Sequence, residues 1–133
     1  HRLLRRFAAA TDEHEIHALL EQFFGFEKPV PLAAARRMAE LRRDPRVTAT
    51  LATVVEAILD GEKQKAFDLA RLSDLPHPVH LVWGDQDRVL PLSQIRAVPG
   101  TVGVHVFAGV GHMPHLEVAR EVTRIVAEAA AGE

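Results

Sequence analysis

The sequence contains no cysteine, which excludes disulfide bonds, thiolate metal sites and a cysteine nucleophile. It also lacks a long apolar run, because charged residues interrupt every hydrophobic stretch well before the ~20 residues that a membrane-spanning helix needs. Neither charge sign dominates: 16 Lys and Arg against 18 Asp and Glu give a net charge of -2 at pH 7. We therefore expect no nucleic-acid partner and no membrane contact, and a reducing cytoplasm is the expected compartment.

What is present is ordinary for a globular domain. The 133 residues are 47% hydrophobic and 26% charged, enough apolar material for a real core. The chain opens on His1 instead of Met and enters an amphipathic pattern at once. That beginning is expected of a fragment or a processed product.

The first half of the chain has the period of helices. Residues 12–24 carry apolar side chains at i, i+3, i+4, i+7 and i+8, and Asp12 with Glu15 fits a capping box. Pro31 is placed to open the next helix. Asp44-Pro45 supplies an N-cap and a first-turn proline for a third helix, which Gly61 ends. The inward face of this third helix is expected to be Val47, Leu51, Val54, Val55, Ile58 and Leu59.

The pattern changes after Leu75. Residues 78–83 (PVHLVW) and 102–107 (VGVHVF) are short apolar runs rich in β-branched residues, which is typical of parallel strands buried on both faces. Residues 91–98 favour a short helix between them, and residues 116–130 favour a final helix. The sequence therefore predicts an α/β fold with a helical segment at 1–68 and an α/β segment at 69–133 that contains two parallel strands.

Two ionisable residues follow the predicted strands. Asp87 lies in the loop after the first strand, and His112 lies in a glycine-rich loop after the second. Alone, an Asp in such a loop is usually a turn or cap residue, and a lone loop His is usually incidental. Together, in this order and 25 residues apart, they match the acid and the base of a catalytic triad in which the serine precedes both. We expect both to be catalytic.

At these loops the sequence resembles α/β-hydrolases of the meta-cleavage hydrolase and esterase group. Residues 83–91 (WGDQDRVLP) and 109–117 (GVGHMPHLE) are similar to the last two strand loops of that family. There the Asp before Arg-Val-x-Pro and the His of Gly-x-Gly-His are catalytic, which the resemblance carries to Asp87 and His112. The resemblance implies the C-terminal part of an α/β-hydrolase fold, with an incomplete sheet and a helical cap. Its substrate would be an acyl ester or thioester.

The helical half resembles one subgroup. Residues 6–10, 15–24 and 63–69 are similar to the cap of the hydrolase-like C-terminal domain of the acetoin dehydrogenase complex's dihydrolipoamide acetyltransferase. This resemblance implies a lipoyl group on an upstream domain and no cofactor within this chain. The cap would cover an acyl pocket that a set of apolar residues could line, although such residues are more often core: Phe23, Phe24, Phe26, Met38 and Leu41.

The family's nucleophile motif, G-x-S-x-G, is missing. Only Ser73 and Ser93 are present, and neither has the flanking glycines, so the chain alone is expected to be inactive. Two parallel strands also leave ladder groups unpaired. We expect about five or six further strands before His1. Otherwise another chain would complete the sheet, and a chain that stands alone would oligomerise.

Three alternatives remain open at the level of sequence. Histidine pairs spaced i, i+3 allow a metal module, but no third or fourth ligand can be named, so we expect no metal site. The chain could instead be a noncatalytic interaction module, in which Asp87 and His112 are relics. It could also be part of an esterase or C–C hydrolase. Arg88 and Asp85 are expected to stabilise their loop and not to touch substrate.

Overall fold

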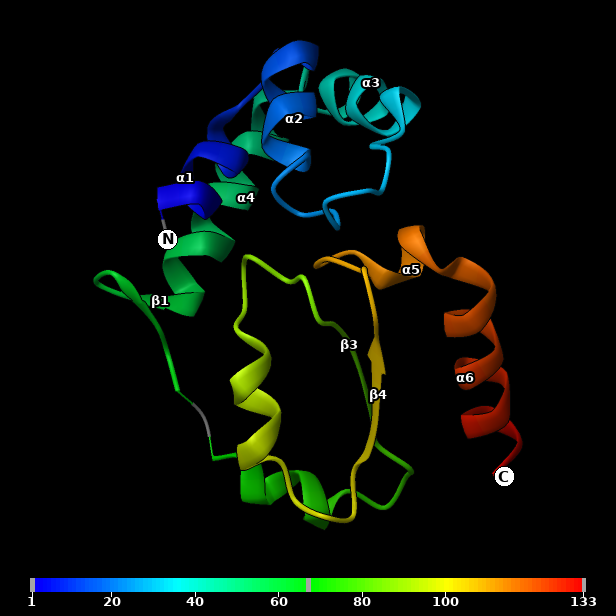
Figure 1. Cartoon of the computed structure of the whole chain (residues 1–133). Coiled ribbons are helices and arrows are strands. Elements are labelled where there is room, and N and C mark those ends of the chain that lie inside the picture. Colours follow the sequence, from blue (N-terminus) through cyan, green and yellow to red (C-terminus); the bar gives the residue numbers. More distant parts are fainter. Residues whose placement is uncertain (1, 67, 133) are drawn as a thin grey trace. The chain divides into compact units, whose positions relative to one another are not determined.

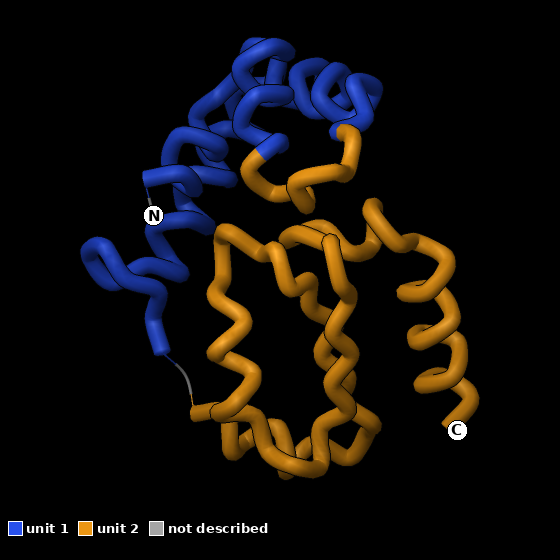
Figure 2. The backbone as a smooth tube through the Cα atoms, viewed as in Figure 1, with its two compact units in different colours: residues 1–21, 30–67 blue, residues 22–29, 68–133 orange. Residues whose placement is uncertain are grey.

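The computed structural model describes residues 2–66 and 68–132 (Figure 1). The chain folds as two compact units, which Figure 2 shows in different colours. Unit 1 combines His1–Glu21 with Val30–Phe67, and unit 2 combines Gln22–Pro29 with Asp68–Glu133. The short segment 22–29 therefore leaves the helical unit and becomes part of the unit that holds the strands.

Unit 1 is helical. It contains α1 (Arg2–Ala9), α2 (Glu13–Leu20), α3 (Leu32–Leu41) and α4 (Pro45–Ile58). Helix α2 packs on α3, and α1 packs on α4. Two buried apolar clusters hold these pairs together, one formed by Ala10, Ile16, Leu19, Leu20 and Ala35 and one by Ala8, Val55 and Leu59. None of the helices among the described residues is long and apolar enough to cross a membrane.

The helix starts follow the predicted capping residues. Asp44 accepts a hydrogen bond from the backbone of Arg46, and Pro45 is the first residue of α4. Asp12 accepts from the backbone of His14 and Glu15 at 2.9 and 3.0 Å. The other half of the predicted capping box is not found, because the Glu15 carboxylate pairs with Arg6 at 3.1 Å instead.

The end of α4 differs from the prediction. The helix stops at Ile58 and is followed by a short antiparallel hairpin, whose strands β1 (Leu59–Asp60) and β2 (Lys63–Gln64) have two residues each. Gly61 has a φ of 61° and therefore forms the turn of this hairpin; it does not end the helix. The predicted inward face is also too wide, since Val54 and Ile58 are 50% and 42% exposed. Only part of that apolar stripe finds partners within the described residues.

A buried arginine closes α1. The Nη1 of Arg42 donates to the carbonyl oxygens of Phe7 and Ala10, both at 2.6 Å, and its guanidinium lies 4.6 Å from the centre of the Phe7 ring. The Phe7 carbonyl belongs to the last turn of α1 and Ala10 directly follows the helix, where helical partners are missing and a positive charge is favourable. Burial lowers the pKa of Arg42, but the guanidinium group stays charged because the ordinary pKa of arginine lies far above neutrality. Arg42 thus fixes the end of α1 against the residues that follow α3.

We predict that Arg42→Ala lowers the free energy of unfolding by roughly 2–4 kcal/mol, because two buried carbonyls lose their donor. Arg42→Lys should recover only part of this loss, since a lysine cannot reproduce the fork of donors. Arg43→Ala, at an exposed neighbouring position, is the matched control and should change stability by less than about 0.5 kcal/mol. Thermal and urea unfolding followed by circular dichroism would measure all three. Equal losses for Arg42→Ala and Arg43→Ala would contradict the assignment.

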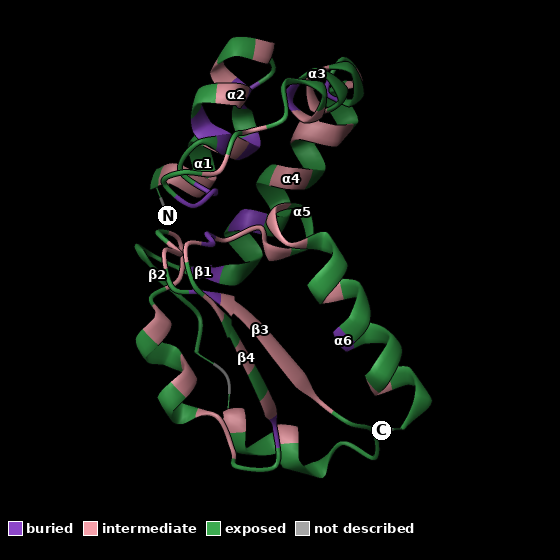
Figure 3. Cartoon of the chain, turned by 45° about the vertical axis from the view of Figure 1, so that its right-hand side comes forward, coloured by how far each residue is buried: buried purple, intermediate pink, exposed green. Residues whose placement is uncertain are grey.

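Unit 2 is built around a parallel pair of strands. Its elements are η1 (a 3-10 helix, Leu69–Asp74), β3 (His80–Gly84), η2 (a 3-10 helix, Leu92–Ala97), β4 (Gly103–Phe107), α5 (Pro114–Glu117) and α6 (Ala119–Ala131). Strands β3 and β4 pair in parallel, with His80 opposite Gly103 and Gly84 opposite Phe107. In Figures 1 and 3 the strands run between η2 and α6. The predicted strands and their direction are confirmed.

Two details of unit 2 depart from the prediction. The expected single C-terminal helix is divided at Val118, whose φ and ψ of -136° and 52° lie outside the helical region. The strands are not buried on both faces, since Val104 and Val106 of β4 are 42% and 46% exposed. Figure 3 shows exposed positions along β4. The prediction failed there because the sheet has only two strands within the described residues.

Candidate active site

Asp87 is held rigidly in the loop after β3. Its own N–H donates to the carbonyl of Gly84 at 3.3 Å, which closes a turn at the end of the strand. The Oδ1 atom accepts from the backbone N–H groups of Val89 and Leu90 at 2.8 and 2.9 Å. The side chain is only 6% exposed. Asp87 is therefore a loop cap through one carboxylate oxygen, and the second oxygen remains available for another partner.

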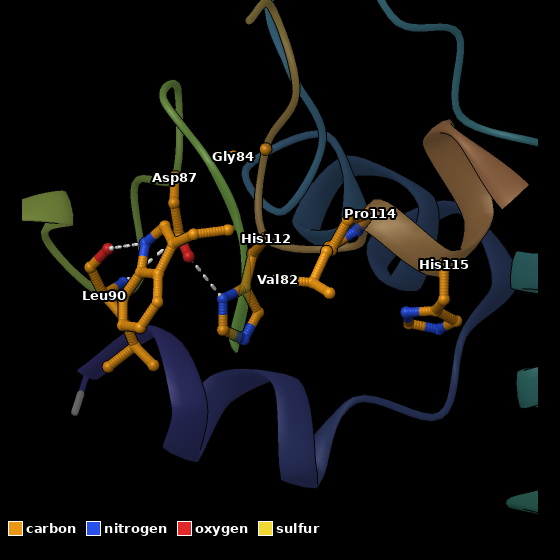
Figure 4. Close-up of a pocket in the computed structure, with 9 residues that line it drawn as sticks. Val82, Gly84, Asp87, Leu90, His112, Pro114 and His115 are labelled. Atoms are coloured by element: carbon orange, nitrogen blue, oxygen red, sulfur yellow. Dashed lines mark hydrogen bonds and ion pairs between the residues drawn. The ribbon is translucent and has the colours of Figure 1, made fainter. Parts of the chain in front are cut away.

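That second oxygen meets His112. The Oδ2 atom of Asp87 lies 2.8 Å from Nδ1 of His112 (Figure 4). An ionised carboxylate only accepts hydrogen bonds, so Nδ1 of His112 is the donor and carries the proton. In the neutral ring, Nε2 then has a free lone pair on the side away from Asp87. No hydrogen bond to Nε2 is found within the part of the chain that the structure describes, so this atom can act as a base.

The charge of Asp87 follows from its surroundings. Burial by itself would raise the pKa of the carboxyl group. The hydrogen bond from His112 and those from the Leu90 and Val89 amides together outweigh burial, and the pKa of Asp87 lies below its ordinary value of 3.8. The carboxylate is consequently ionised throughout the neutral range, as the hydrogen-bond pattern requires.

This lowered pKa predicts a pH-dependent contribution to stability. A carboxyl group with a depressed folded-state pKa stabilises the fold above its unfolded pKa, and the effect disappears as pH falls through the folded value. Asp87→Asn should therefore cost roughly 1–2 kcal/mol at pH 7 and progressively less below about pH 3.8. Urea unfolding at several pH values would measure the difference. A pH-independent difference between the two proteins would show that the charge of Asp87 contributes nothing.

Three backbone segments approach one another closely behind this pair. A Cβ on Gly84 would lie 2.1 Å from the carbonyl oxygen of Val110 and 2.3 Å from that of Gly111. A Cβ on Gly25 would meet the carbonyl oxygen of Gly109 at 2.2 Å, and one on Gly111 would meet the backbone of residues 23–25. The segment 22–25, the end of β3 and the loop after β4 can therefore only pack this way with glycine at all three positions.

Polar contacts reinforce the same three segments. The backbone N–H of His112 donates to the carbonyl of Phe23 at 2.6 Å, and the two rings are 5.7 Å apart. Asp85 Oδ1 accepts from the N–H of Gly109 at 2.8 Å. Arg88 donates to the carbonyl of Phe24 at 2.9 Å and lies over the ring of Phe26. Asp85 and Arg88 thus bind backbone of the loops, in keeping with the stabilising role expected of them.

We predict that Gly84→Ala displaces the His112 loop and lowers the free energy of unfolding by roughly 1–3 kcal/mol, because the added carbon would collide with two carbonyl groups. Gly100→Ala is the matched control, since nothing lies within 4 Å of its added carbon. Urea unfolding gives the stability, and NMR of the His112 ring reports the displacement. An unchanged His112 spectrum in Gly84→Ala would rule out this close packing.

An open pocket of about 190 Å³ lies beside the Asp87–His112 pair. Figure 4 shows the residues that line it, which are Val82, Trp83, Gly84, Asp87, Leu90, Gly111, His112, Pro114 and His115. All belong to unit 2. Apart from Asp87 and the two histidines, the lining is apolar side chain and glycine, and the indole of Trp83 is fixed by a hydrogen bond to the carbonyl of Leu90. A small apolar group could therefore bind against His112.

The remaining candidates from the sequence lie elsewhere. Ser73 bonds to Thr101 at 3.1 Å and Ser93 lies on η2, so neither lines the pocket. The apolar residues considered for the cap differ among themselves: Phe23 and Phe24 are buried in unit 2, whereas Phe26 is 70% exposed. The other two belong to unit 1, Met38 packing against its core and Leu41 being 49% exposed.

One residue of this site was not singled out in the sequence. Glu117, at the end of α5, accepts hydrogen bonds from the backbone of Gly25, Gly111 and Met113. A carboxylate five residues after the histidine was visible in the sequence. Its role was not, because one of its three partners lies 92 positions away.

The histidine pairs do not gather into a metal centre. Within the described residues, no group of three or more His, Cys, Asp or Glu side chains is placed to hold a metal ion. His80 and His105, on neighbouring strands, instead bond to each other, with Nδ1 of the first 3.0 Å from Nε2 of the second. Gly103 provides the space, since a Cβ there would lie 2.7 Å from Nδ1 of His80.

Comparison with known sequences points to one family. A family model described as the alpha/beta hydrolase family matches residues 1–125. Two curated relatives are dihydrolipoyllysine-residue acetyltransferase components of an acetoin cleaving system. The protein from Cupriavidus necator is 27% identical over 120 residues, and that from Pseudomonas putida is 30% identical over 121. These matches cover 90% and 91% of this chain and 32% of each relative, so the chain spans about a third of their length.

Solved structures agree on the fold. The 2-hydroxy-6-oxo-6-phenylhexa-2,4-dienoate hydrolase from Rhodococcus sp. strain RHA1 superimposes with a TM-score of 0.71. The match covers 98% of this chain and 48% of that protein at 22% sequence identity. At this identity the likeness establishes the fold alone.

Proposed function

Because this chain belongs to the alpha/beta hydrolase family, we propose that Asp87 and His112 are the acid and base of a Ser-His-Asp triad in an acyl-transfer enzyme. The observation that carries the proposal is the 2.8 Å contact between Asp87 Oδ2 and His112 Nδ1, with the other carboxylate oxygen fixed by two amides. A further support is the order of the two residues in the chain, with the acid before the base, as in the family's triad. The family's G-x-S-x-G motif does not occur within residues 1–133. The serine would therefore be supplied from outside these residues.

In this mechanism Nε2 of His112 removes the proton from the serine hydroxyl as its oxygen attacks the acyl carbon. Asp87 keeps Nδ1 protonated, so that Nε2 is the basic atom, and stabilises the imidazolium that forms. The imidazolium then returns its proton to the leaving alcohol or thiol as the bond from the acyl carbon breaks. In the second half-reaction His112 takes a proton from the acceptor as the acceptor's oxygen or sulfur attacks the acyl carbon. The imidazolium then returns this proton to the serine oxygen as the bond between serine and the acyl carbon breaks. The small apolar pocket beside His112 would receive a short acyl group.

We propose further that the acyl group is acetyl and that its acceptor is a thiol of a dihydrolipoyl group on another domain. The support is the likeness to the two acetoin-system acetyltransferase components. Hydrolysis is the alternative, in which water replaces the thiol acceptor; its support is that the Rhodococcus protein, which shares the fold, is named a hydrolase. Product analysis separates them, because transfer to dihydrolipoamide yields a new thioester, whereas hydrolysis yields free acid.

The test uses the whole protein, with this chain joined to the rest of its sequence. We expect Asp87→Asn and His112→Ala each to lower kcat for acyl thioester turnover by about 10³- to 10⁴-fold. Asp74→Asn and His77→Ala, at exposed positions outside the site, are the matched controls and should stay within about twofold of the unmodified enzyme. The 133-residue chain alone should show no turnover. Full activity in both Asp87→Asn and His112→Ala would refute the catalytic assignment.

A further inference from the structure

Glu117 gathers three backbone donors at the base of the His112 loop. Its Oε2 accepts from the N–H of Gly25 at 2.8 Å and from that of Gly111 at 2.9 Å. Its Oε1 accepts from the N–H of Met113 at 3.1 Å and also lies 3.1 Å from the N–H of Gly111. Gly111 and Met113 are the two neighbours of His112 in the chain, so the carboxylate holds the loop on both sides of the histidine.

Together with one main-chain contact, this carboxylate satisfies three consecutive N–H donors of the loop. The N–H of His112 itself donates to the carbonyl of Phe23 at 2.6 Å, so all three consecutive N–H groups from Gly111 to Met113 have an acceptor. An ionised carboxylate is suited to this place because it offers two oxygens that only accept. A glutamine would present one accepting oxygen, and its NH₂ group would face donors.

Glu117 does not line the pocket, and it makes no contact with the His112 ring among the described hydrogen bonds. It fixes the main chain from which the ring projects, whereas Asp87 fixes the ring through Nδ1. Two carboxylates therefore fix His112 at opposite ends: Glu117 holds the backbone on both sides of its Cα, and Asp87 holds its ring nitrogen. Catalysis by a base requires such positioning, since a small misplacement of the reacting group is costly in rate.

We propose that Glu117 is a positioning residue, which acts through His112 by holding the backbone on both sides of it. The catalytic consequence rests on the function proposed above for His112. The structural part does not: the orientation of the His112 ring toward Asp87 depends on Glu117 whether or not the protein is an enzyme.

The test compares Glu117→Gln with Glu121→Gln in the whole protein, because Glu121 is an exposed carboxylate in the first turn of α6. We expect Glu117→Gln to lower kcat by about 10- to 100-fold per active site while KM stays within about twofold. Titration of active sites with a stoichiometric acylating probe removes the effect of any unfolded fraction. The NMR signal of the Nδ1–H proton of His112 should shift or disappear in Glu117→Gln and stay unchanged in Glu121→Gln.

The possible failures are distinguishable. If His112→Ala is fully active, the proposed function fails. The Nδ1–H signal of His112 in Glu117→Gln then tests the structural part of the proposal by itself. If His112→Ala is inactive but Glu117→Gln keeps both its kcat and its Nδ1–H signal, the positioning role is overturned. Should Glu117→Gln not fold, Glu117→Asp replaces it, since it keeps the charge and shortens the reach, and the same changes are expected. If neither variant folds, Glu117 supports the fold as a whole, and that outcome overturns the proposal as well.

Discussion

The structure of unit 2 depends on one steric constraint, the contact of three main-chain segments where no side-chain carbon fits. Gly25, Gly84 and Gly111 stand at this contact, and a Cβ on any of them would lie within 2.6 Å of backbone atoms. Polar side chains can link segments at longer range, but only glycine lets carbonyl groups approach to this distance. The alignment of Asp87 with His112 follows from this packing. Asp87 lies three residues after Gly84, and His112 directly follows Gly111.

Three carboxylates bind the backbone of the segments that the glycines allow to pack closely. Asp85, Asp87 and Glu117 together accept six backbone N–H groups, on Gly109, Val89, Leu90, Gly25, Gly111 and Met113. Loops that follow strands have amides without ladder partners, and charged acceptors satisfy them more strongly than neutral ones. Hence the acidic residues around the site have separate tasks. Asp87 also pairs with an ionisable side chain, His112, which makes its second oxygen the chemically distinctive one.

Features that depend on nearest neighbours in sequence could be predicted. The start of α4 at Asp44-Pro45 is set by a cap and a proline, and β3 and β4 are set by short β-branched runs. The pairing of Asp87 with His112 was also within reach, because the ends of adjacent parallel strands meet at one edge of a sheet. The catalytic role of the pair stays a prediction.

Features that depend on distant contacts could not be predicted. Nothing local distinguishes residues 22–29 from a loop between two helices, and their place in unit 2 arises from contacts with residues about 60 to 90 positions away. The role of Glu117 was hidden for the same reason. The exposure of Val104 and Val106 was missed because β-branched composition indicates a strand but does not say what covers each face.

The discontinuity of unit 2 has a consequence for inheritance. A stretch of eight residues that lies amid the helices, Gln22–Pro29, belongs physically with residues 68–133. Recombination between related genes at a junction near residue 68 would exchange the two reactive loops but leave this stretch from the other parent. Such a hybrid would pair the Gly25 of one lineage with the Glu117 and Gly109 of another. Any residue other than glycine at position 25 of such a hybrid would press its Cβ against the carbonyl of Gly109, although more than eighty residues of sequence separate the two positions.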